Sequence, residues 1–365
     1  MKRFSTVFVL LLASCFLFAQ GIKPMPPADP AAVAATDANG RTLTISDPID
    51  RLMIVGKAGN MPANILFLFP EVADMHLTLP KTDQGLGDFF ALIDPALDAK
   101  SRISQQASVE EIATANADLV LMKATHYQSL ATKLDQLQVP NYTVSLETWD
   151  EWQSELVEFG LLLQNPKRAE EILNLYREKL SFIKERVATV TEPKRLLLLQ
   201  ADRRDNTTSY KVAPDDWLQT WMVQTIGATA VWQGTNKAAA GWSTVSFEQI
   251  AAWDPDLIVL ISYNTPTRSF LEGVYTSPIW ADLAATQHRA ILASPHDLMN
   301  YIQPVASWIL GTTWLAKETY PELFSDIDMV EEVRSFYQNF YSITDERILG
   351  ILTDAYSTSV EQNRQ

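Results

Sequence analysis

The side chains best suited to bind a small molecule follow apolar runs that predict buried strands. Amine, amide, imidazole and phenol groups follow these runs in the first half of the chain, and guanidinium, amide and indole groups follow or flank them in the second half. Ligands of open α/β sheets lie at the carboxyl ends of parallel strands. We therefore predict a site lined by Lys57, Asn60, His126, Tyr127, Arg203, Arg204, Trp217, Trp242, Tyr263, Asn264, Gln303 and Trp308.

His126 is the candidate that could act on a ligand in the largest number of ways. It stands next to Tyr127 after the apolar run 119–121, where an imidazole can ligate a metal or donate an acid-sensitive proton. The alternative is a loop histidine that bonds to the backbone. The charged candidates Lys57, Arg203 and Arg204 have the alternative of lying at the surface, with their stems over apolar atoms and their charges in water.

The tryptophans at 217, 221, 242 and 308 have a simpler alternative, which is packing in the core. An indole ring also offers a flat apolar face to a ligand. We expect two of the four to stack on the ligand.

No catalytic motif accompanies these residues. The chain lacks G-x-S-x-G, H-E-x-x-H, a phosphate-binding P-loop and G-x-G-x-x-G after a strand. The four histidines, His76, His126, His288 and His296, do not have the close spacing that forms a metal site. Two alternatives stay open: a protein that binds a bare transition metal, and a secreted hydrolase with two carboxylates.

Charge and cysteine content exclude several other classes. The 365 residues include 29 Lys and Arg against 44 Asp and Glu, a net charge of −15, which is unsuited to a nucleic-acid partner. The single cysteine, Cys15, lies in the N-terminal apolar run, so the folded body has no disulfide, thiolate metal site or cysteine nucleophile. The length suits two domains.

The N-terminus predicts export. Lys2 and Arg3 precede an apolar stretch that is too short to span a bilayer, as in a secretory signal peptide covering residues 1–19. Residues 12–15 also resemble a lipobox, which would place a lipid on Cys15 instead of cleavage after Ala19. Residues 20–38 are rich in Pro and Ala and predict an extended tether.

An internal echo organises the rest of the chain. Residues 108–121 return as 246–259, with the same offset of 138 for each matched position. Each copy begins with a serine, Ser108 or Ser246, that can cap a helix, and continues through a turn into an apolar strand. Such units recur in any α/β protein, but the matched spacing favours two similarly built lobes.

A helical pattern over residues 149–190 separates the two copies. Apolar residues recur there at spacings of three and four, with a weak point at Asn165-Pro166, where a first helix should end or kink. We predict an α/β fold in which two lobes with mainly parallel sheets, residues 39–148 and 191–327, are bridged by one long helix over 149–190. Residues 328–365 predict C-terminal helices.

Residues 37–55, 277–283 and 310–317, together with the echoed motif, resemble the periplasmic iron-complex and cobalamin binding proteins of ABC importers. The resemblance extends over residues 37–350. It implies a rigid monomer of two lobes that holds a ligand between them and delivers it to a membrane permease. By the same resemblance, Glu71 is a permease contact of the first lobe.

One position departs from that family. Relatives that hold ferric siderophores have an arginine where this chain has Ser307, so an anionic chelate lacks its most obvious charge partner. We expect a non-enzymatic periplasmic or extracellular receptor without a cofactor, which captures an iron complex such as a siderophore, haem or a related metal chelate.

Overall fold

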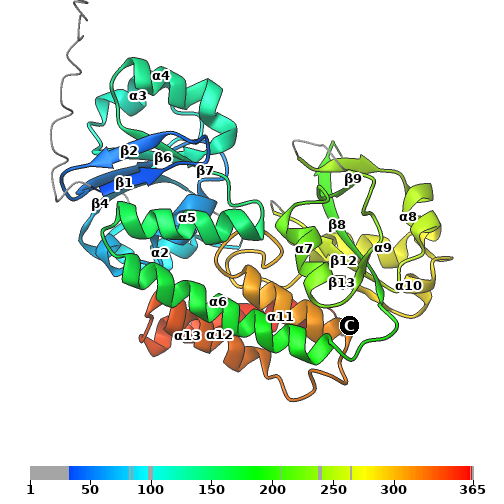
Figure 1. The fold of residues 1–365 in the computed structure, drawn as a ribbon. Helices are drawn as coiled ribbons and strands as arrows, with labels where there is room; N and C mark the ends of the chain where they lie inside the picture. Colours follow the sequence, from blue (N-terminus) through cyan, green and yellow to red (C-terminus); the bar gives the residue numbers. More distant parts are fainter. Residues whose placement is uncertain are drawn as a thin grey trace, which may run out of the picture.

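The computed structural model describes residues 33–81, 84, 86–97, 102–205, 207–236, 241–263, 265–361 and 363. Two α/β lobes stand side by side, and a layer of helices lies beneath them (Figure 1). The predicted fold class is thereby confirmed. The signal peptide, Cys15 and residues 20–32 of the tether lie outside the described residues, whereas residues 33–36, which were predicted as tether, form a strand that pairs with residues 42–45.

The first lobe is built on a parallel sheet with strand order β5-β4-β3-β6-β7. Its strands are β3 (Arg51–Ile54), β4 (His76–Pro80), β5 (Arg102–Ile103), β6 (Leu119–Lys123) and β7 (Asn141–Val144). The lobe's helices are α1 (Asn60–Leu66), α2 (Phe89–Ile93), α3 (Val109–Thr114) and α4 (Thr132–Gln136), and an antiparallel pair, β1 (Val33–Thr36) and β2 (Thr42–Ile45), lies beside them. Every residue of β6 is buried, as expected for a strand covered on both faces.

The second lobe has a mixed sheet with order β11-β9-β8-β12-β13, and β10 also pairs with β8. Its strands are β8 (Arg195–Arg204), β9 (Thr207–Val212), β10 (Thr229–Ala230), β11 (Ser243–Val245), β12 (Leu257–Ile261) and β13 (Ile291–Ala293). Its helices are α7 (Leu218–Thr225), α8 (Phe247–Trp253), α9 (Arg268–Thr276) and α10 (Ala284–Gln287). Strands β8 and β9 pair in antiparallel fashion, whereas β8, β12 and β13 are parallel.

The echoed segments form matching units, α3–β6 and α8–β12. The Ser108 hydroxyl accepts a hydrogen bond from the Glu111 amide at 3.1 Å, and the Ser246 hydroxyl accepts one from the Gln249 amide at 3.2 Å. The two lobes therefore contain the same helix-turn-strand unit, as predicted.

The range 149–190 contains two helices, α5 (Trp149–Leu162) and α6 (Pro166–Val187), which are separated at the predicted break, so the bounds 149–190 of the bridging helix are corrected. Asn165 caps α6 by accepting a hydrogen bond from the Arg168 amide at 3.0 Å, and Pro166 stands in its first turn. Proline lacks the amide hydrogen that would continue α5. Helix α5 packs against β1 and doubles back into α6, so α6 alone, about 33 Å long, bridges the lobes (Figure 1).

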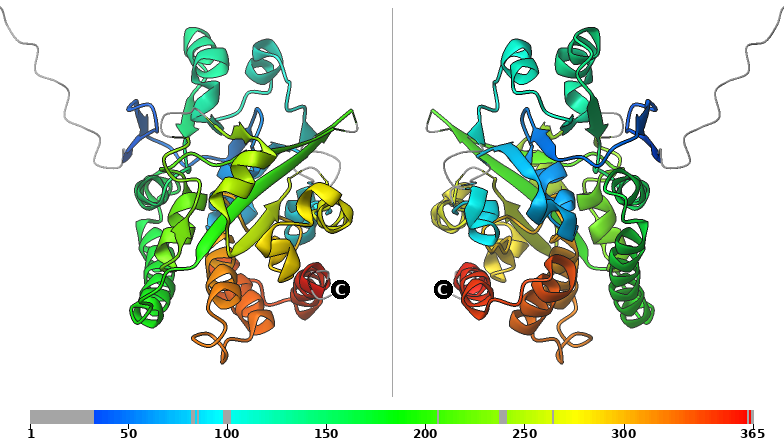
Figure 2. Two further views of the ribbon diagram at one scale, coloured as in Figure 1. Left: turned by 90° about the vertical axis from the view of Figure 1, so that its right-hand side faces the viewer. Right: turned by 90° about the vertical axis from the view of Figure 1, so that its left-hand side faces the viewer.

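The C-terminal helices gather at one end of the molecule, below both lobes (Figure 2). They are α11 (Trp308–Thr319), α12 (Met329–Tyr341) and α13 (Glu346–Glu361). The Arg168 guanidinium of α6 donates to the Phe340 carbonyl at 2.7 Å, and the Tyr176 hydroxyl donates to the Ala306 carbonyl at 2.8 Å. These bonds fasten the bridge to the C-terminal layer. Within the described residues, no helix has the length and apolar character to cross a membrane.

Candidate ligand-binding site

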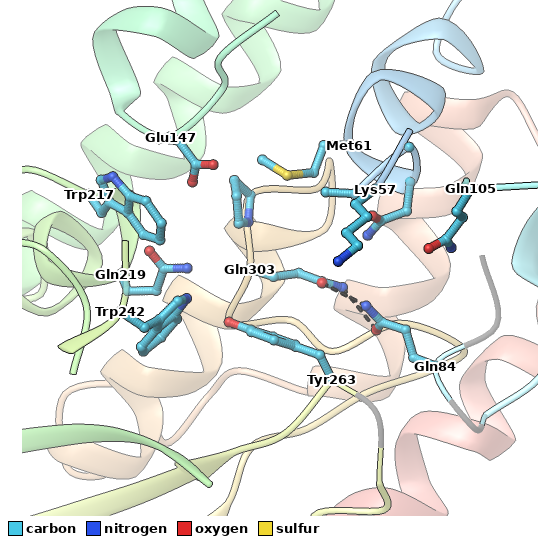
Figure 3. Close-up of a pocket in the computed structure, with 14 residues that line it drawn as sticks. Lys57, Met61, Gln84, Gln105, Glu147, Trp217, Gln219, Trp242, Tyr263 and Gln303 are labelled. Atoms are coloured by element: carbon cyan, nitrogen blue, oxygen red, sulfur yellow. Dashed lines mark hydrogen bonds between the residues drawn. The ribbon is translucent and has the colours of Figure 1, made fainter. Parts of the chain in front are cut away.

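A cavity of about 380 Å³ lies between the lobes, at the carboxyl ends of their parallel strands. Figure 3 shows side chains of both lobes turned toward this space. The lining residues are Lys57, Ala58, Gly59, Asn60, Met61, Gln84, Gln105, Glu147, Trp217, Gln219, Trp242, Tyr263, Gln303 and Pro304. Amides and aromatic rings dominate the list, so the cavity suits hydrogen bonding and stacking rather than acid–base chemistry.

An ion pair stands behind one wall of the cavity. The buried Lys123 at the end of β6, with 3% of its side chain exposed, contacts a carboxylate oxygen of Glu147 at 2.8 Å and also donates to the Ser145 carbonyl. Burial raises the pKa of Glu147, and the charge of Lys123 partly offsets that rise. Burial also raises the pKa of the neighbouring Glu155 to about 8, although this carboxylate accepts a hydrogen bond from the Ser145 amide at 2.8 Å.

Direct hydrogen bonds join the lobes at the edges of the cavity. The amides of Gln84 and Gln303 exchange two hydrogen bonds, at 2.9 and 3.2 Å. The Leu218 amide at the start of α7 donates to the Glu147 carbonyl at 2.6 Å. The buried Asn64 of α1 accepts from the Tyr341 hydroxyl at 2.7 Å, which ties the first lobe to α12. These bonds, together with α6, connect the parts of the molecule around the cavity.

Comparison with known proteins shows the family to which this chain belongs. The profile of the family described as "Periplasmic binding protein" matches residues 74–298, more than half of the chain. The chain belongs to this family. Periplasmic binding proteins are non-enzymatic, so the prediction that the chain is not an enzyme is confirmed and the hydrolase alternative is wrong. The protein is thus a solute-binding protein of an ABC transporter.

Individual relatives are distant. The molybdate-binding protein MolA of Haemophilus influenzae is 25% identical over 336 residues, which cover 84% of this chain and 90% of MolA. The solved structure of MolA bound to molybdate has a TM-score of 0.69 at 19% identity and covers 85% of this chain and 98% of MolA.

Two further solved structures share the fold. A periplasmic solute-binding protein from Veillonella parvula has a TM-score of 0.68 at 20% identity, covering 90% of this chain and 99% of that one. CeuE of Helicobacter pylori, solved as a nickel–histidine complex, has a TM-score of 0.66 at 19% identity, covering 88% and 99%. At these identities, the likeness supports the bilobal fold and leaves the ligand open.

Half of the predicted ligand contacts line the cavity of this periplasmic binding protein. They are Lys57, Asn60, Trp217, Trp242, Tyr263 and Gln303. Each was selected because it follows or flanks a strand end, and the sheets place those ends around the cavity. Their contact with a ligand stays a prediction, and Asn264 lies outside the described residues.

His126 lies behind the cavity wall rather than in it. Its Nε2 accepts a hydrogen bond from the Lys57 amide at 3.0 Å. Gly56 has a φ of +80°, and a Cβ at that position would lie 2.7 Å from the imidazole ring. The ring therefore supports the turn that carries Lys57, which is the backbone-bonded alternative for this histidine. Tyr127 lies further out, with the Arg41 guanidinium 5.2 Å from its ring centre.

Arg203 and Arg204 do not line the cavity, because they belong to strand β8 rather than to a loop after it. The strand continues through Arg204 and pairs with β9. The Arg203 guanidinium lies 4.9 Å from the ring centre of Phe270. The Arg204 side chain is 83% exposed and contacts Asp202 at 3.4 Å. Both arginines thus take the surface alternative.

Trp308 is a core residue, with no exposed surface. Its ring stacks on Tyr176 of α6 at 5.0 Å and 2°, and it meets Trp149 edge to face at 5.4 Å. The adjacent Ser307 is also buried. Trp308 therefore serves the packing of α11 against the bridge, and the expectation that it faces the ligand is corrected.

Four polar lining residues were missed by the sequence prediction: Gln84, Gln105, Glu147 and Gln219. Glu147 follows β7. Residues 141–144 include types that favour strands, so the loop after them could have been added to the predicted site by the same reasoning. Gln84 and Gln105 follow β4 and β5. Gln219 lies in the first turn of α7, where strand-end reasoning gives no signal.

Glu71 is held at the start of α6. The Asn165 side-chain amide donates to its Oε1 at 2.7 Å, while its Oε2 is buried without a partner among the described residues. This geometry gives Glu71 a role in fastening the helix bridge. Contact with a permease stays a prediction.

Proposed function

We propose that this periplasmic binding protein captures a metal chelate between its lobes and delivers it to an ABC permease. The observation that carries the proposal is the cavity itself. Its volume of about 380 Å³ falls in the range of sites for small organic molecules and exceeds the size of a bare ion. Its tryptophans offer flat apolar faces, and its amides offer both donors and acceptors.

The charges of the lining favour a chelate of low net charge. Among the lining residues that the structure describes, Lys57 is the single cation and Glu147 the single carboxylate. A multiply anionic catecholate complex would find one ammonium to face it. A hydroxamate complex, whose charge is largely neutralised by its own iron, matches the amide-rich lining better. An iron complex is thus the favoured cargo.

A bare metal ion fits less well. Within the described residues, no group of three or more His, Cys, Asp or Glu side chains could hold one. Such ions need several nitrogen, sulfur or carboxylate ligands at close range. Molybdate is the second candidate, because MolA is similar over most of its length. That anion would need the Lys57 ammonium and the neighbouring amide groups.

Delivery to the permease requires little internal motion. Helix α6 and the Gln84–Gln303 pair hold the lobes together, so we expect the permease to separate them by a few degrees rather than through a wide hinge. The net charge of −15 suits basic pockets on the membrane partner. A lipid on Cys15 would keep the receptor at the membrane.

Ligand binding is tested with a panel on the purified mature chain. The panel contains ferric hydroxamate and catecholate siderophores, haemin, cobalamin, molybdate, and iron, zinc and manganese salts. Thermal unfolding and tryptophan fluorescence are measured, since Trp217 and Trp242 line the cavity. A ligand at a hundred times its Kd stabilises the native state by about 2.7 kcal/mol.

The expected result is a shift with one chelate that Trp242→Phe weakens. Trp253→Phe is the matched control, since Trp253 lies on α8 and outside the cavity. A shift with molybdate or with a bare metal alone would replace the chelate proposal by the corresponding ion. If no compound of the panel shifts the unfolding temperature or the fluorescence, the chelate proposal is overturned.

A further inference from the structure

The cavity has two chemically different ends. Lys57, Gln84 and Gln105 lie at one end, while Glu147, Trp217, Gln219 and Trp242 lie at the other (Figure 3). This division suits a ligand whose two ends differ in charge and polarity. The end around Glu147 is the more specialised, because it combines aromatic faces with a carboxylate.

Three rings form a corner at this end. Trp217 and Trp242 meet at 86° with their centres 6.2 Å apart, and Trp242 and Tyr263 meet at 64° and 6.1 Å. Edge-to-face contacts turn neighbouring ring faces in different directions, so a group in the corner meets more than one π surface. Such corners attract alkylammonium groups, whose positive charge interacts with the ring faces.

The Glu147 carboxylate supplies a matching negative charge. Lys123 approaches its Oε1 from behind at 2.8 Å, and no donor among the described residues bonds its Oε2. Glu151 adds a second carboxylate nearby, although it bonds the backbone amides of Glu147 and Thr148. The raised pKa of Glu155, about 8, keeps that side chain mostly protonated at neutral pH. Glu147 and Glu151 thus place two carboxyl groups beside the one lysine behind this wall.

Gln219 adds an unused acceptor. Its side chain is buried, lines the cavity, and lies within hydrogen-bonding reach of the Tyr263 hydroxyl. Tyr263 itself donates to the Ile302 carbonyl at 2.7 Å, so its oxygen accepts from the Gln219 amide group. The Oε1 of Gln219 then has no partner among the described residues. A buried acceptor without a partner is costly, and a ligand N–H group would satisfy it.

We propose that the Glu147 end is an ammonium subsite, and that the cargo is a chelate whose organic part carries a protonated amine. The inference rests on the proposed function and names the class of chelate. The ammonium would lie in the corner of Trp217, Trp242 and Tyr263, facing the Oε2 of Glu147. The oxygen-rich part of the chelate would lie toward Lys57 and the amides.

The first test compares two probes that differ by one charge. Ferrioxamine B is an iron(III) trihydroxamate with a free terminal ammonium, and its N-acetylated form has the same chelate without that charge. We expect the ammonium form to bind the wild-type protein about tenfold to a hundredfold more tightly. Glu147→Gln should remove most of that preference. Glu110→Gln, which removes the same charge from an exposed position on α3, should retain it.

A second variant and a second probe keep the test decisive. If Glu147→Gln fails to fold because Lys123 loses its partner, Trp242→Leu removes one wall of the corner and should reduce the same preference. Pentylammonium is titrated against 1-pentanol, with tryptophan fluorescence as the readout. The ammonium compound should perturb the fluorescence of the wild type and not that of the variants, and the alcohol should perturb neither.

The outcomes separate the two proposals. Equal binding of both ferrioxamine forms, or an ammonium preference that survives in Glu147→Gln and Trp242→Leu, would overturn the subsite and leave chelate capture standing. Binding of pentylammonium with no binding of any chelate would support the subsite and overturn chelate capture. Absence of both kinds of binding would overturn both proposals.

Discussion

The two echoed units, α3–β6 and α8–β12, begin alike and end differently. Ser108 and Ser246 cap their helices in the same way. The turns before the strands contain Asn116 and Asp254, at equivalent positions, with φ values of +54° and +41°. Asn and Asp adopt this left-handed conformation more readily than most residues. Up to the strand, local chemistry produces the same structure twice.

The strands then end in different environments. Lys123 is the last residue of β6, and Ile261 is the equivalent last residue of β12. Both side chains are buried. Lys123 is tolerated there because Glu147 and the Ser145 carbonyl face its ammonium. After β6, His126 supports a neighbouring turn, whereas Tyr263 after β12 lines the cavity. The first lobe thus has a buried ion pair behind the cavity lining, whereas the second lobe contributes aromatic rings to the lining itself.

The largest expected effect concerns the buried acid of the first lobe. Burial raises the pKa of Glu155 from 4.5 to about 8 in the folded protein. The folded state keeps this proton while the unfolded state releases it near pH 4.5, so the stability it contributes is lost as pH rises toward 8. Between pH 5 and pH 8, the wild type should lose about 3–4 kcal/mol relative to Glu155→Gln. Urea unfolding of both proteins at several pH values measures this, and parallel pH profiles would contradict it.

The second effect separates the equivalent strand ends. Lys123→Met leaves the Glu147 carboxylate without its partner and should destabilise the protein by about 3 kcal/mol at pH 7. Ile261→Met at the matching position conserves volume and should cost less than about 1.5 kcal/mol. The loss of stability in Lys123→Met should shrink as pH falls toward 4.5, because the unfolded state then also binds the proton that burial favours on Glu147 in the folded state. Equal losses in the two variants at pH 7 would show that the ion pair contributes nothing.

A third effect tests the indirect role of His126. Gly56→Ala places a methyl group against the imidazole in a left-handed backbone and should cost about 2 kcal/mol. It should also weaken ligand binding, because the turn carries Lys57 and Asn60. Gly273→Ala is the control, since a Cβ there meets no atom within 4 Å. Chemical unfolding and ligand titration provide the two readouts, and unchanged binding in a folded Gly56→Ala protein would argue against the support role.

The smallest effect tests the likeness of the units. Ser108→Ala and Ser246→Ala each remove one helix cap and should each cost about 1 kcal/mol. Urea unfolding of the two single variants measures this. A large difference between them would mean that the lobes depend unequally on a shared motif.

The fold could be predicted to a large extent because its signals are local. Serine caps, the break at Pro166 and apolar strand runs each depend on residues a few positions apart. The length of β8 could not be predicted, since its second half is held by pairing with β9. For the same reason, the predicted site mixes residues of the cavity with Arg203 and Arg204, which lie on that extension.

Local signals in the chain predict where the two capped helices begin, that the unit occurs twice, and which loops follow several of the strand ends. These features arise from backbone hydrogen bonding and apolar periodicity over short distances. Local signals do not predict that Glu147 faces the cavity with Lys123 behind it, or that Trp308 packs on Tyr176. Both outcomes depend on burial between segments far apart in the chain, where the partner of a charge or a ring comes from another element.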